Sequence, residues 1–389
     1  MRTIDRVHVA IDLTGMMPVP TGVDVYMKQI VLSVARVDRR NRYTVLLSRG
    51  SQSVFQGALP NNFVKRVITT PHRPVRACVQ QFLLPGIARA SRFDVIHSPA
   101  FLKPLLSAAP RHLLSVHDAT FFHMPEVHNA LRSSRPFLWA VRKSIRTADR
   151  ITVPSRATRD ALLQEIRDLP ASRVRVIPLG IDTAYSPGDP RETQAALDRL
   201  GIQRPYMLFV GTLEPRKNLG LLLESYRMLA AAGKIREHLV LAGQTGWGPR
   251  EWENTLAAPE LRGRVHRLGY VPDEQLLWLY RGAGLFVYPS LCEGFGLPPL
   301  EAMACGAPVV AAGNSALAEN LAGAAELVRA GDVDALASAI HTVLGSVEAS
   351  NRYRALGLER AAAFRWETTA ARTVELYEEL AEPRKALAK

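Results

Sequence analysis

Short apolar segments recur along the chain, and each is followed by a loop and then by the periodicity of a helix. The first segment, residues 7–13, precedes a loop with proline and glycine and a helix predicted from about Val23 to Val37. Further strands of the first half are predicted at residues 43–48, 63–70, 93–99 and 112–120, with another beginning at residue 174. This alternation of strands and helices predicts an α/β fold with parallel sheets.

The alternation restarts after a glycine- and proline-containing loop within residues 174–187. Residues 204–219 contain a new strand, a loop and a helix start, and later strands are predicted at residues 239–248, 265–271 and 285–290. The chain is therefore predicted to form two Rossmann-like domains in series, residues 1–182 and 183–366. No GxGxxG motif follows the first strand, which argues against a dinucleotide-binding domain.

Residues 290–312, SLCEGFGLPPLEAMACGAPVVAA, are predicted to form a loop, a short helix and a buried strand. Proline suits a helix start because its fixed φ and missing N–H cost nothing there, so the helix is expected to begin near Pro299. Gly306 suits the end of the helix. These bounds place Glu301 in the first turn of the predicted helix.

Glu293 precedes this helix in a glycine-rich loop, so the segment combines two carboxylates, Glu293 and Glu301, with a glycine loop at a helix N-terminus. A glycine loop at a helix N-terminus presents free N–H groups to a phosphate, and carboxylates accept hydrogen bonds from sugar hydroxyls. The combination indicates a phosphorylated sugar or a sugar nucleotide. On spacing alone, the alternative is that Glu301 stabilises the helix dipole and Glu293 is a surface charge of the loop.

The loop GTLEPRKN, residues 211–218, brings Arg216 and Lys217 to a loop-to-helix junction. Two cations suit a diphosphate whose negative charge grows as a glycosidic bond breaks. The alternative is an exposed Arg-Lys pair at a helix start, which has no such role.

Composition is that of an ordinary globular protein, with 389 residues, of which 47% are hydrophobic. No apolar run reaches the roughly 18 to 20 residues of a membrane span, and no signal peptide is expected from the N-terminal residues. The three cysteines have no metal-ligand spacing and are expected to be reduced, cytoplasmic thiols.

Charge is distributed unevenly between the two halves of the chain. Residues 1–180 carry 27 Lys and Arg against 11 Asp and Glu, whereas residues 181–389 carry 22 against 25. An excess of this kind fits an anionic membrane surface, a phosphate-bearing lipid or nucleic acid, or simply a soluble basic domain. One basic and amphipathic stretch contains Arg73, Arg76, Arg89 and Arg92, which also fits a solvated helix face.

The run EGFGLPPLEAMACGAPVV, in which seven residues lie between Glu293 and Glu301, resembles the signature of retaining nucleotide-sugar glycosyltransferases of family four. That family has the GT-B fold, two Rossmann-like domains with parallel sheets facing a deep interdomain cleft. The resemblance covers most of residues 5–380. It implies that Glu301 binds the nucleotide ribose, that Glu293 lies beside the donor sugar, and that a C-terminal helix of about residues 367–389 packs back on the first domain.

The resemblance assigns further residues to the donor and the reaction. His117 matches a histidine that contacts the donor sugar; the alternative is a strand-end histidine with a structural role. Gly22 matches a glycine that faces the donor diphosphate; the alternative is that Gly22 is a plain turn glycine. Family members often have an arginine directly after the loop glycine, where this chain has Thr212, so Arg216 is expected to supply that charge beside Lys217. The remaining donor-binding positions are Gly211, Thr212, Tyr270 and Val271, and Phe295, Gly296 and Leu297 at the helix N-terminus.

The family implies the transfer of a hexose, with mannose or a deoxyhexose favoured, from a nucleotide diphosphate sugar, with a GDP-sugar favoured. The acceptor is expected to be a saccharide or a lipid-linked saccharide of surface polysaccharide or lipopolysaccharide synthesis. No metal cofactor and no nucleic acid partner are expected, and the enzyme is expected in the cytoplasm, where the basic domain could hold it peripherally on the inner face of the membrane. The alternatives are a GT-B sugar-nucleotide epimerase or hydrolase, and a noncatalytic basic protein that binds membrane or nucleic acid.

Overall fold

The computed structural model describes residues 6–17, 21–55, 57, 59–68, 79–105 and 110–382. The chain divides into two compact units, one formed by residues 1–119, 134–180 and 365–389 and the other by residues 120–133 and 181–364. The division near residue 180 lies two residues from the sequence-based boundary. Residues 120–133, which the sequence analysis placed in the first domain, group with the second unit, where the indole Nε1 of Trp247 donates a hydrogen bond to the carbonyl of Val127 (2.9 Å).

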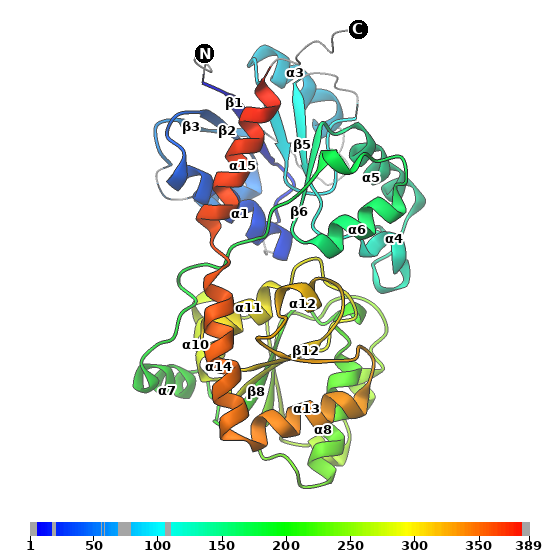
Figure 1. The fold of residues 1–389 in the computed structure, drawn as a ribbon, viewed down its shortest axis with the longest axis vertical. Helices are drawn as coiled ribbons and strands as arrows, with labels where there is room; N and C mark the ends of the chain where they lie inside the picture. The colour runs from blue at the N-terminus through cyan, green and yellow to red at the C-terminus, as the bar shows by residue number, and fades with distance from the viewer. Residues whose placement is uncertain are drawn as a thin grey trace. The chain divides into compact units, whose positions relative to one another are not determined.

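The first unit contains a seven-stranded parallel sheet in the order β3-β2-β1-β4-β5-β6-β7 (Figure 1). Its strands are β1 (His8–Leu13), β2 (Arg42–Ser48), β3 (Phe63–Ile68), β4 (Val95–Ser98), β5 (Arg111–Ser115), β6 (Arg150–Val153) and β7 (Val174–Val176). The inner strands are buried on both faces, which explains why they read as apolar runs.

The helices of the first unit cover this sheet. They are α1 (Gly22–Val37), α3 (Leu84–Ala90), α5 (Arg135–Thr147), α6 (Arg156–Glu165) and α15 (Trp366–Ala381), with the short turns η1 (Arg49–Phe55), η2 (Val79–Leu83) and η4 (Ala171–Arg173). The C-terminal helix α15 packs along α1, and the hydroxyl of Thr369 donates to the carbonyl of Pro178 (2.7 Å). Arg73 and Arg76 lie outside the described residues.

The second unit contains a six-stranded parallel sheet in the order β10-β9-β8-β11-β12-β13. Its strands are β8 (Tyr206–Val210), β9 (His238–Ala242), β10 (Val265–Gly269), β11 (Leu285–Tyr288), β12 (Val309–Ala312) and β13 (Glu326–Val328). Its helices and helical turns are α4 (Thr120–His123), η3 (Pro125–Val127), α7 (Pro190–Arg199), η5 (Pro215–Lys217), α8 (Leu219–Ala231), α9 (Trp252–Leu256), η6 (Pro259–Leu261), α10 (Asp273–Gly282), α11 (Leu297–Ala304), α12 (Ser315–Asn320), α13 (Val333–Gly345) and α14 (Val347–Ala362).

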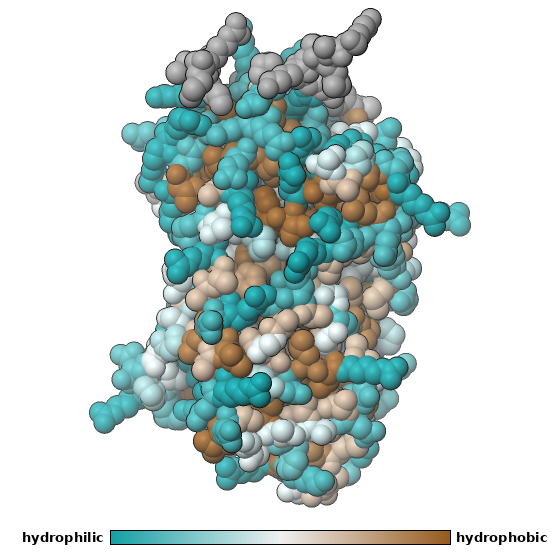
Figure 2. All heavy atoms as spheres, in the orientation of Figure 1, coloured by the Kyte–Doolittle hydropathy of each residue, from teal (hydrophilic) through white to brown (hydrophobic). Residues whose placement is uncertain are grey.

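Several strands are shorter than predicted. The prediction ran to residue 120 for β5 and to residue 271 for β10, whereas the ladders end at Ser115 and Gly269. The apolar character continues past each ladder because the following loops are partly buried. On the face drawn in Figure 2, hydrophilic side chains cover much of each unit with apolar patches between them.

The helix of the key segment, α11, begins earlier than predicted. It starts at Leu297 rather than near Pro299, so both prolines lie in the first turn, where a missing N–H is tolerated. Glu301 therefore lies in the second turn, and the prediction that it lies in the first turn was wrong. Gly306 follows the helix with a positive φ of 82°, which confirms its predicted role at the end of α11.

Candidate active site

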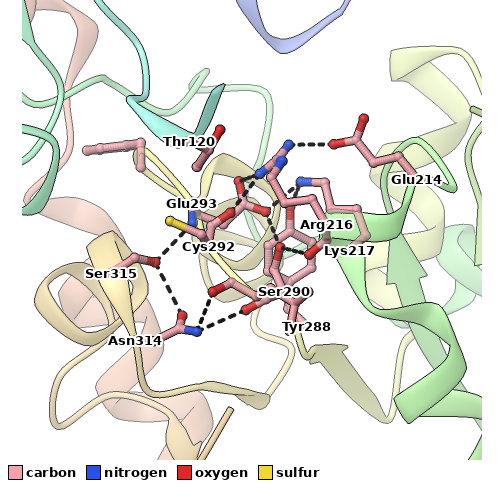
Figure 3. Close-up of polar contacts among 12 residues, drawn as sticks. Thr120, Glu214, Arg216, Lys217, Tyr288, Ser290, Cys292, Glu293, Asn314 and Ser315 are labelled. Atoms are coloured by element: carbon pink, nitrogen blue, oxygen red, sulfur yellow. Dashed lines mark hydrogen bonds and ion pairs between the residues drawn. The ribbon is translucent and has the colours of Figure 1, made fainter. Parts of the chain in front are cut away.

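Arg216, Lys217 and Glu293 form a compact charged cluster in the second unit (Figure 3). Arg216 and Lys217 belong to η5, which follows β8, and Glu293 lies in the loop after β11. Because β8 and β11 are adjacent parallel strands, the segments that leave their carboxyl ends meet at the same edge of the sheet. The topology therefore brings together residues that are 76 positions apart in the chain.

The carboxylate of Glu293 is held at both oxygens. Its Oε1 lies 2.6 Å from Nζ of Lys217 and accepts a hydrogen bond from the hydroxyl of Ser290 (2.5 Å), while its Oε2 lies 2.6 Å from Nη1 of Arg216. Glu293 is 8% exposed. The alternative that it is a surface charge of the loop is therefore wrong.

Lys217 is buried, Arg216 exposes only 15% of its side chain, and both cations have further partners. Lys217 is 7% exposed, and its ammonium donates to the hydroxyl oxygen of Tyr288 (2.5 Å). Arg216 donates to a carboxylate oxygen of Glu214 (2.7 Å) and to the carbonyl of Cys292 (2.9 Å). An exposed Arg-Lys pair, the alternative left open by the sequence, is excluded by this geometry.

Electrostatics fix the charge state of the cluster. Burial alone would raise the pKa of Glu293, but the charges of Arg216 and Lys217 outweigh it and lower this pKa to about 2. Burial and the neighbouring Arg216 lower the pKa of Lys217, and the charge of Glu293 opposes them. Glu293 is therefore an anion near neutral pH, and its charge favours the ammonium form of Lys217 across their 2.6 Å contact.

Backbone and hydroxyl groups fix the loop that carries Glu293. The Glu293 N–H donates to the hydroxyl of Ser315 (2.9 Å), and the amide of Asn314 donates to the carbonyl of Leu291 (2.7 Å). Leu291 in turn donates its N–H to the carbonyl of Arg216 (2.8 Å), which ties this loop to η5. The rotamer of Glu293 is thus held from several sides, as a pre-organised site requires (Figure 3).

Glu301 has a different environment. One of its oxygens accepts a hydrogen bond from the buried hydroxyl of Tyr280 (2.9 Å), and the carboxylates of Asp273 and Asp182 lie near it. Burial is the largest of the effects that raise its pKa to about 7. Two glutamates of one motif therefore differ in charge state near neutral pH.

Phe295, Gly296 and Leu297, which are predicted to bind the donor, lie at the N-terminus of α11. Gly296 has a φ of 92°, and a Cβ there would lie 2.5 Å from the Leu317 side chain, so the close packing of α12 and the left-handed backbone both favour glycine. Phe295 is buried with its ring edge-on to Phe364, and its carbonyl accepts from Asn320 (2.8 Å). Leu297 is the first helical residue.

The other predicted donor-binding residues of the second unit lie after β8 and β10. A Cβ at Gly211 would lie 3.6 Å from Cε of Lys217, so this loop adjoins the cluster, and Thr212 packs against Gly246. Tyr270 and Val271 follow the end of β10, and Tyr270 is half exposed. A backbone contact with a nucleobase at these two residues stays a prediction.

His117 and Gly22 belong to the first unit. His117 follows the carboxyl end of β5, its Nε2 hydrogen-bonds to the carbonyl of Pro99 (2.7 Å), and its ring lies edge-on to Tyr26. Gly22 is the first residue of α1 and not part of the preceding loop, and the space around a Cβ there is open. The roles of both residues toward a donor stay predictions.

Some residues of the site were not predicted from the sequence. Glu214, Tyr288 and Ser290 contact the cluster directly, and Tyr280 bonds Glu301. Glu214 carried a signal, because it lies two residues before Arg216. The tyrosines did not, since each reads as one more apolar position of a buried strand or helix.

Within the described part of the chain, no group of three or more His, Cys, Asp or Glu residues could hold a metal ion. No described helix is long and apolar enough to cross a membrane.

The sequence is similar to two families of known proteins. Residues 20–185 match the family described as Glycosyltransferase Family 4, and residues 193–359 match the family described as Glycosyl transferases group 1. An O-antigen chain mannosyltransferase B of Escherichia coli is 34% identical over 284 residues, which cover 73% of this chain and 74% of that protein. A serotype-specific mannosyltransferase WbdA of Escherichia coli is 30% identical over 54% of this chain, a match that spans only 26% of that protein.

The fold is similar to that of solved glycosyltransferase structures. The crystal structure of Anabaena Alr3699/HepE in complex with UDP-glucose has a TM-score of 0.76 and 20% sequence identity, and the alignment covers 96% of this chain and 100% of that one.

Proposed function

The chain belongs to the group 1 glycosyltransferases of family four and has the GT-B fold, and from this premise we propose that it is a retaining hexosyltransferase that uses a nucleotide diphosphate sugar. The predicted family and fold class are thereby confirmed. The favoured sugar is mannose, because the mannosyltransferases of Escherichia coli are similar to this chain. A deoxyhexose is the second choice, and a GDP-sugar is the favoured donor.

The observation that carries the proposal is the buried cluster of Arg216, Lys217 and Glu293. The two cations are fixed by several contacts and largely shielded from water, so they can stabilise charge that develops on a departing diphosphate without reorganising. Burial also strengthens each electrostatic interaction relative to water. A surface pair of cations would supply neither advantage.

Glu293 has a role other than proton transfer in this proposal. Its pKa of about 2 leaves it ionised, and both of its oxygens are engaged, so it is neither a general acid nor a free base. It orients Arg216 and Lys217 and presents negative charge beside the donor sugar. With no other base assigned, the attacking hydroxyl would pass its proton to the leaving diphosphate, with attack on the same face and retained configuration.

The remaining roles follow the family assignment. Glu301 would accept hydrogen bonds from the ribose hydroxyls, and the N–H groups near Phe295, Gly296 and Leu297 would face the diphosphate at the positive end of α11. His117 and Gly22 of the first unit would contact the donor sugar and the diphosphate. Metal independence is part of the proposal, because Arg216 and Lys217 supply the positive charge that a metal ion would otherwise provide.

The proposed acceptor is a saccharide or lipid-linked saccharide of surface polysaccharide or lipopolysaccharide synthesis. The name of the O-antigen chain mannosyltransferase supports this class of product. We place the enzyme in the cytoplasm, peripherally on the inner face of the membrane through its basic first unit.

A donor-consumption assay tests this function. The purified protein is incubated with GDP-mannose, GDP-fucose and UDP-glucose, each with and without a mannose-terminated oligosaccharide acceptor and with EDTA, and products are identified by NMR. The proposal expects a product from one GDP-sugar whose linkage keeps the anomeric configuration of that donor, which is α for GDP-mannose, only with acceptor and equally in EDTA. Free sugar or an altered sugar nucleotide without acceptor would indicate the hydrolase or epimerase instead, and inactivity toward every donor would contradict the proposal.

A further inference from the structure

A strongly basic pocket lies at the amino edge of the first unit's sheet, on the side where strands β1 and β2 begin. Its volume is about 870 Å³. No Asp or Glu is among its described lining residues. We call this site the basic pocket, because six of its lining residues are cationic: Arg6, Arg39, Arg40, Arg42, Lys65 and Arg66.

The register of the sheet explains why these charges meet. His8 at the start of β1 pairs with Arg42 at the start of β2, and β3 continues alongside as the edge strand with exposed residues Val64 to Val67. Arg39 and Arg40 lie in the short connection between α1 and β2. Three separate segments, around residues 6, 39–42 and 65–66, therefore bring positive charge to one concave surface.

The neighbouring carboxylates are already engaged. Glu378 of α15 pairs with Arg40, Asp94 accepts the backbone N–H of His8 (2.8 Å), and Asp38 accepts the hydroxyl of Tyr43 (2.5 Å). Within the described residues, no carboxylate forms an ion pair with Arg39 or Arg42. Like charges that are crowded without a counterion repel one another, so a bound anion would relieve this repulsion.

From this geometry we propose that the basic pocket binds a multiply charged phosphate or diphosphate group. Arginine presents a planar fork of N–H donors that matches phosphate oxygens, and several arginines on one concave surface suit a multiply charged anion better than a single carboxylate. Soluble diphosphates and phosphate-bearing lipid headgroups share this chemistry.

This site is separate from the proposed donor site. His8 and the pocket lie at the amino edge of the sheet, whereas His117 follows the opposite, carboxyl edge. The six residues of β1 separate the two edges by about 17 Å at the usual rise per residue. The inference therefore stands whether or not the proposed transfer reaction is correct.

His8 offers a local reporter of binding. Its Nε2 is 3.0 Å from the hydroxyl oxygen of Thr44 at the floor of the pocket. Burial and the charge of Arg42 lower the pKa of His8, while Asp94 opposes them. An anion bound beside Arg42 adds negative charge and should raise this pKa.

The test follows the His8 ring by NMR in the full chain, with the signal assigned by comparison with His8→Gln. The Lys217→Ala background removes a cation of the donor site, and inorganic diphosphate is the soluble probe. A second arm uses phosphatidylcholine vesicles with and without phosphatidic acid. A shift with diphosphate identifies a soluble ligand, and a shift only with phosphatidic acid identifies a lipid headgroup.

Arg42→Gln is expected to weaken the response at least tenfold, and Arg39→Gln provides a second variant should Arg42→Gln fail to fold. Arg49→Gln is the matched control, since Arg49 is exposed on the same unit but does not line the pocket, and it should change the affinity less than twofold. Without anion at low salt, Arg42→Gln should melt no lower than the parent chain, because it removes a repelling charge. An unresponsive His8 in both arms, or equal weakening by Arg42→Gln and Arg49→Gln, would overturn the proposal.

Discussion

The ammonium of Lys217 lies 2.6 Å from the carboxylate of Glu293, and both side chains are at least nine-tenths buried. Arg216 completes the arrangement from the other carboxylate oxygen. The cations proposed to meet a diphosphate are therefore already held by a carboxylate of the protein. A bound diphosphate must share these cations with Glu293 or displace it.

Lys217→Met is expected to lower kcat/KM for transfer by about 10²- to 10³-fold, because it removes one of two preorganised positive charges. It should also lower the free energy of unfolding by about 3 kcal/mol, since the buried Glu293 keeps only Arg216 as an ionic partner. Steady-state kinetics and urea unfolding measure the two effects. Lys234→Met, at an exposed position of the same unit, should change neither, and a Lys217→Met enzyme with normal kcat/KM would remove Lys217 from the mechanism.

Glu293→Gln separates binding from catalysis. The amide keeps the shape of the side chain but releases the charge on Arg216 and Lys217, so the affinity for a nucleoside diphosphate should rise severalfold. Transfer should nevertheless slow by roughly 100-fold, because the two cations lose the group that orients them. Calorimetric titration and kcat supply the comparison. Weaker nucleotide binding in Glu293→Gln would mean that the carboxylate does not compete for these cations.

Much of the fold could be predicted because local pattern and tertiary structure agree. Buried parallel strands give apolar runs, and glycine and proline mark the loops between them, as at Gly306. The start of α6 follows the same local rule, with the Thr158 N–H bonded to the hydroxyl of the capping Ser155 (3.0 Å). Arg216, Lys217 and Glu293 stood out because charged groups beside glycine loops are unusual within apolar surroundings.

Strand order and burial could not be predicted from these local patterns. The contact of Glu293 with Lys217 depends on β8 and β11 being neighbours, although β9 and β10 lie between them in sequence. The helix start near Pro299 was misplaced because a proline fits any position of a first turn. The basic pocket escaped prediction because three separate segments supply its residues.

Glu301 predicts a specific pH dependence of stability. Its pKa in the folded protein is about 7, above the ordinary 4.5, so between these values the folded state holds a proton that the unfolded state has released. The contribution of Glu301 to the free energy of unfolding therefore falls as pH rises from 4.5 to 7, by at most about 3 kcal/mol.

Glu301→Gln should remove this decline. Urea unfolding at intervals from pH 4.5 to 8 measures it as the difference between the variant and the parent chain. The variant should gain relative stability as pH rises, whereas a constant difference across the range would show that Glu301 titrates normally.

The contribution of His97 to the free energy of unfolding is expected to fall as the pH falls, which is the opposite of the trend for Glu301. It is fully buried in the first unit, bonded to the hydroxyls of Tyr377 (2.7 Å) and Ser115 (2.8 Å), and burial lowers its pKa to about 3. Its contribution to stability is complete above pH 6.5 and is lost as pH falls toward 3, by at most about 5 kcal/mol.

His97→Gln should therefore be less stable than the parent chain at pH 7, because the amide cannot reproduce both hydrogen bonds. The difference should shrink as pH falls below 6.5, and thermal unfolding across pH 4.5 to 7.5 follows it. A difference that is independent of pH would indicate that His97 is not the titrating group.

The measurement that tests the central claim most directly is calorimetric titration of GDP and UDP into the parent chain, Lys217→Met and Lys234→Met at pH 7.5. The account predicts one-to-one binding, with GDP favoured, that weakens at least tenfold in Lys217→Met and is unchanged in Lys234→Met. Failure of both nucleotides to bind the parent chain, or equal binding by all three proteins, would contradict the assignment of the buried cluster to a nucleotide-sugar donor.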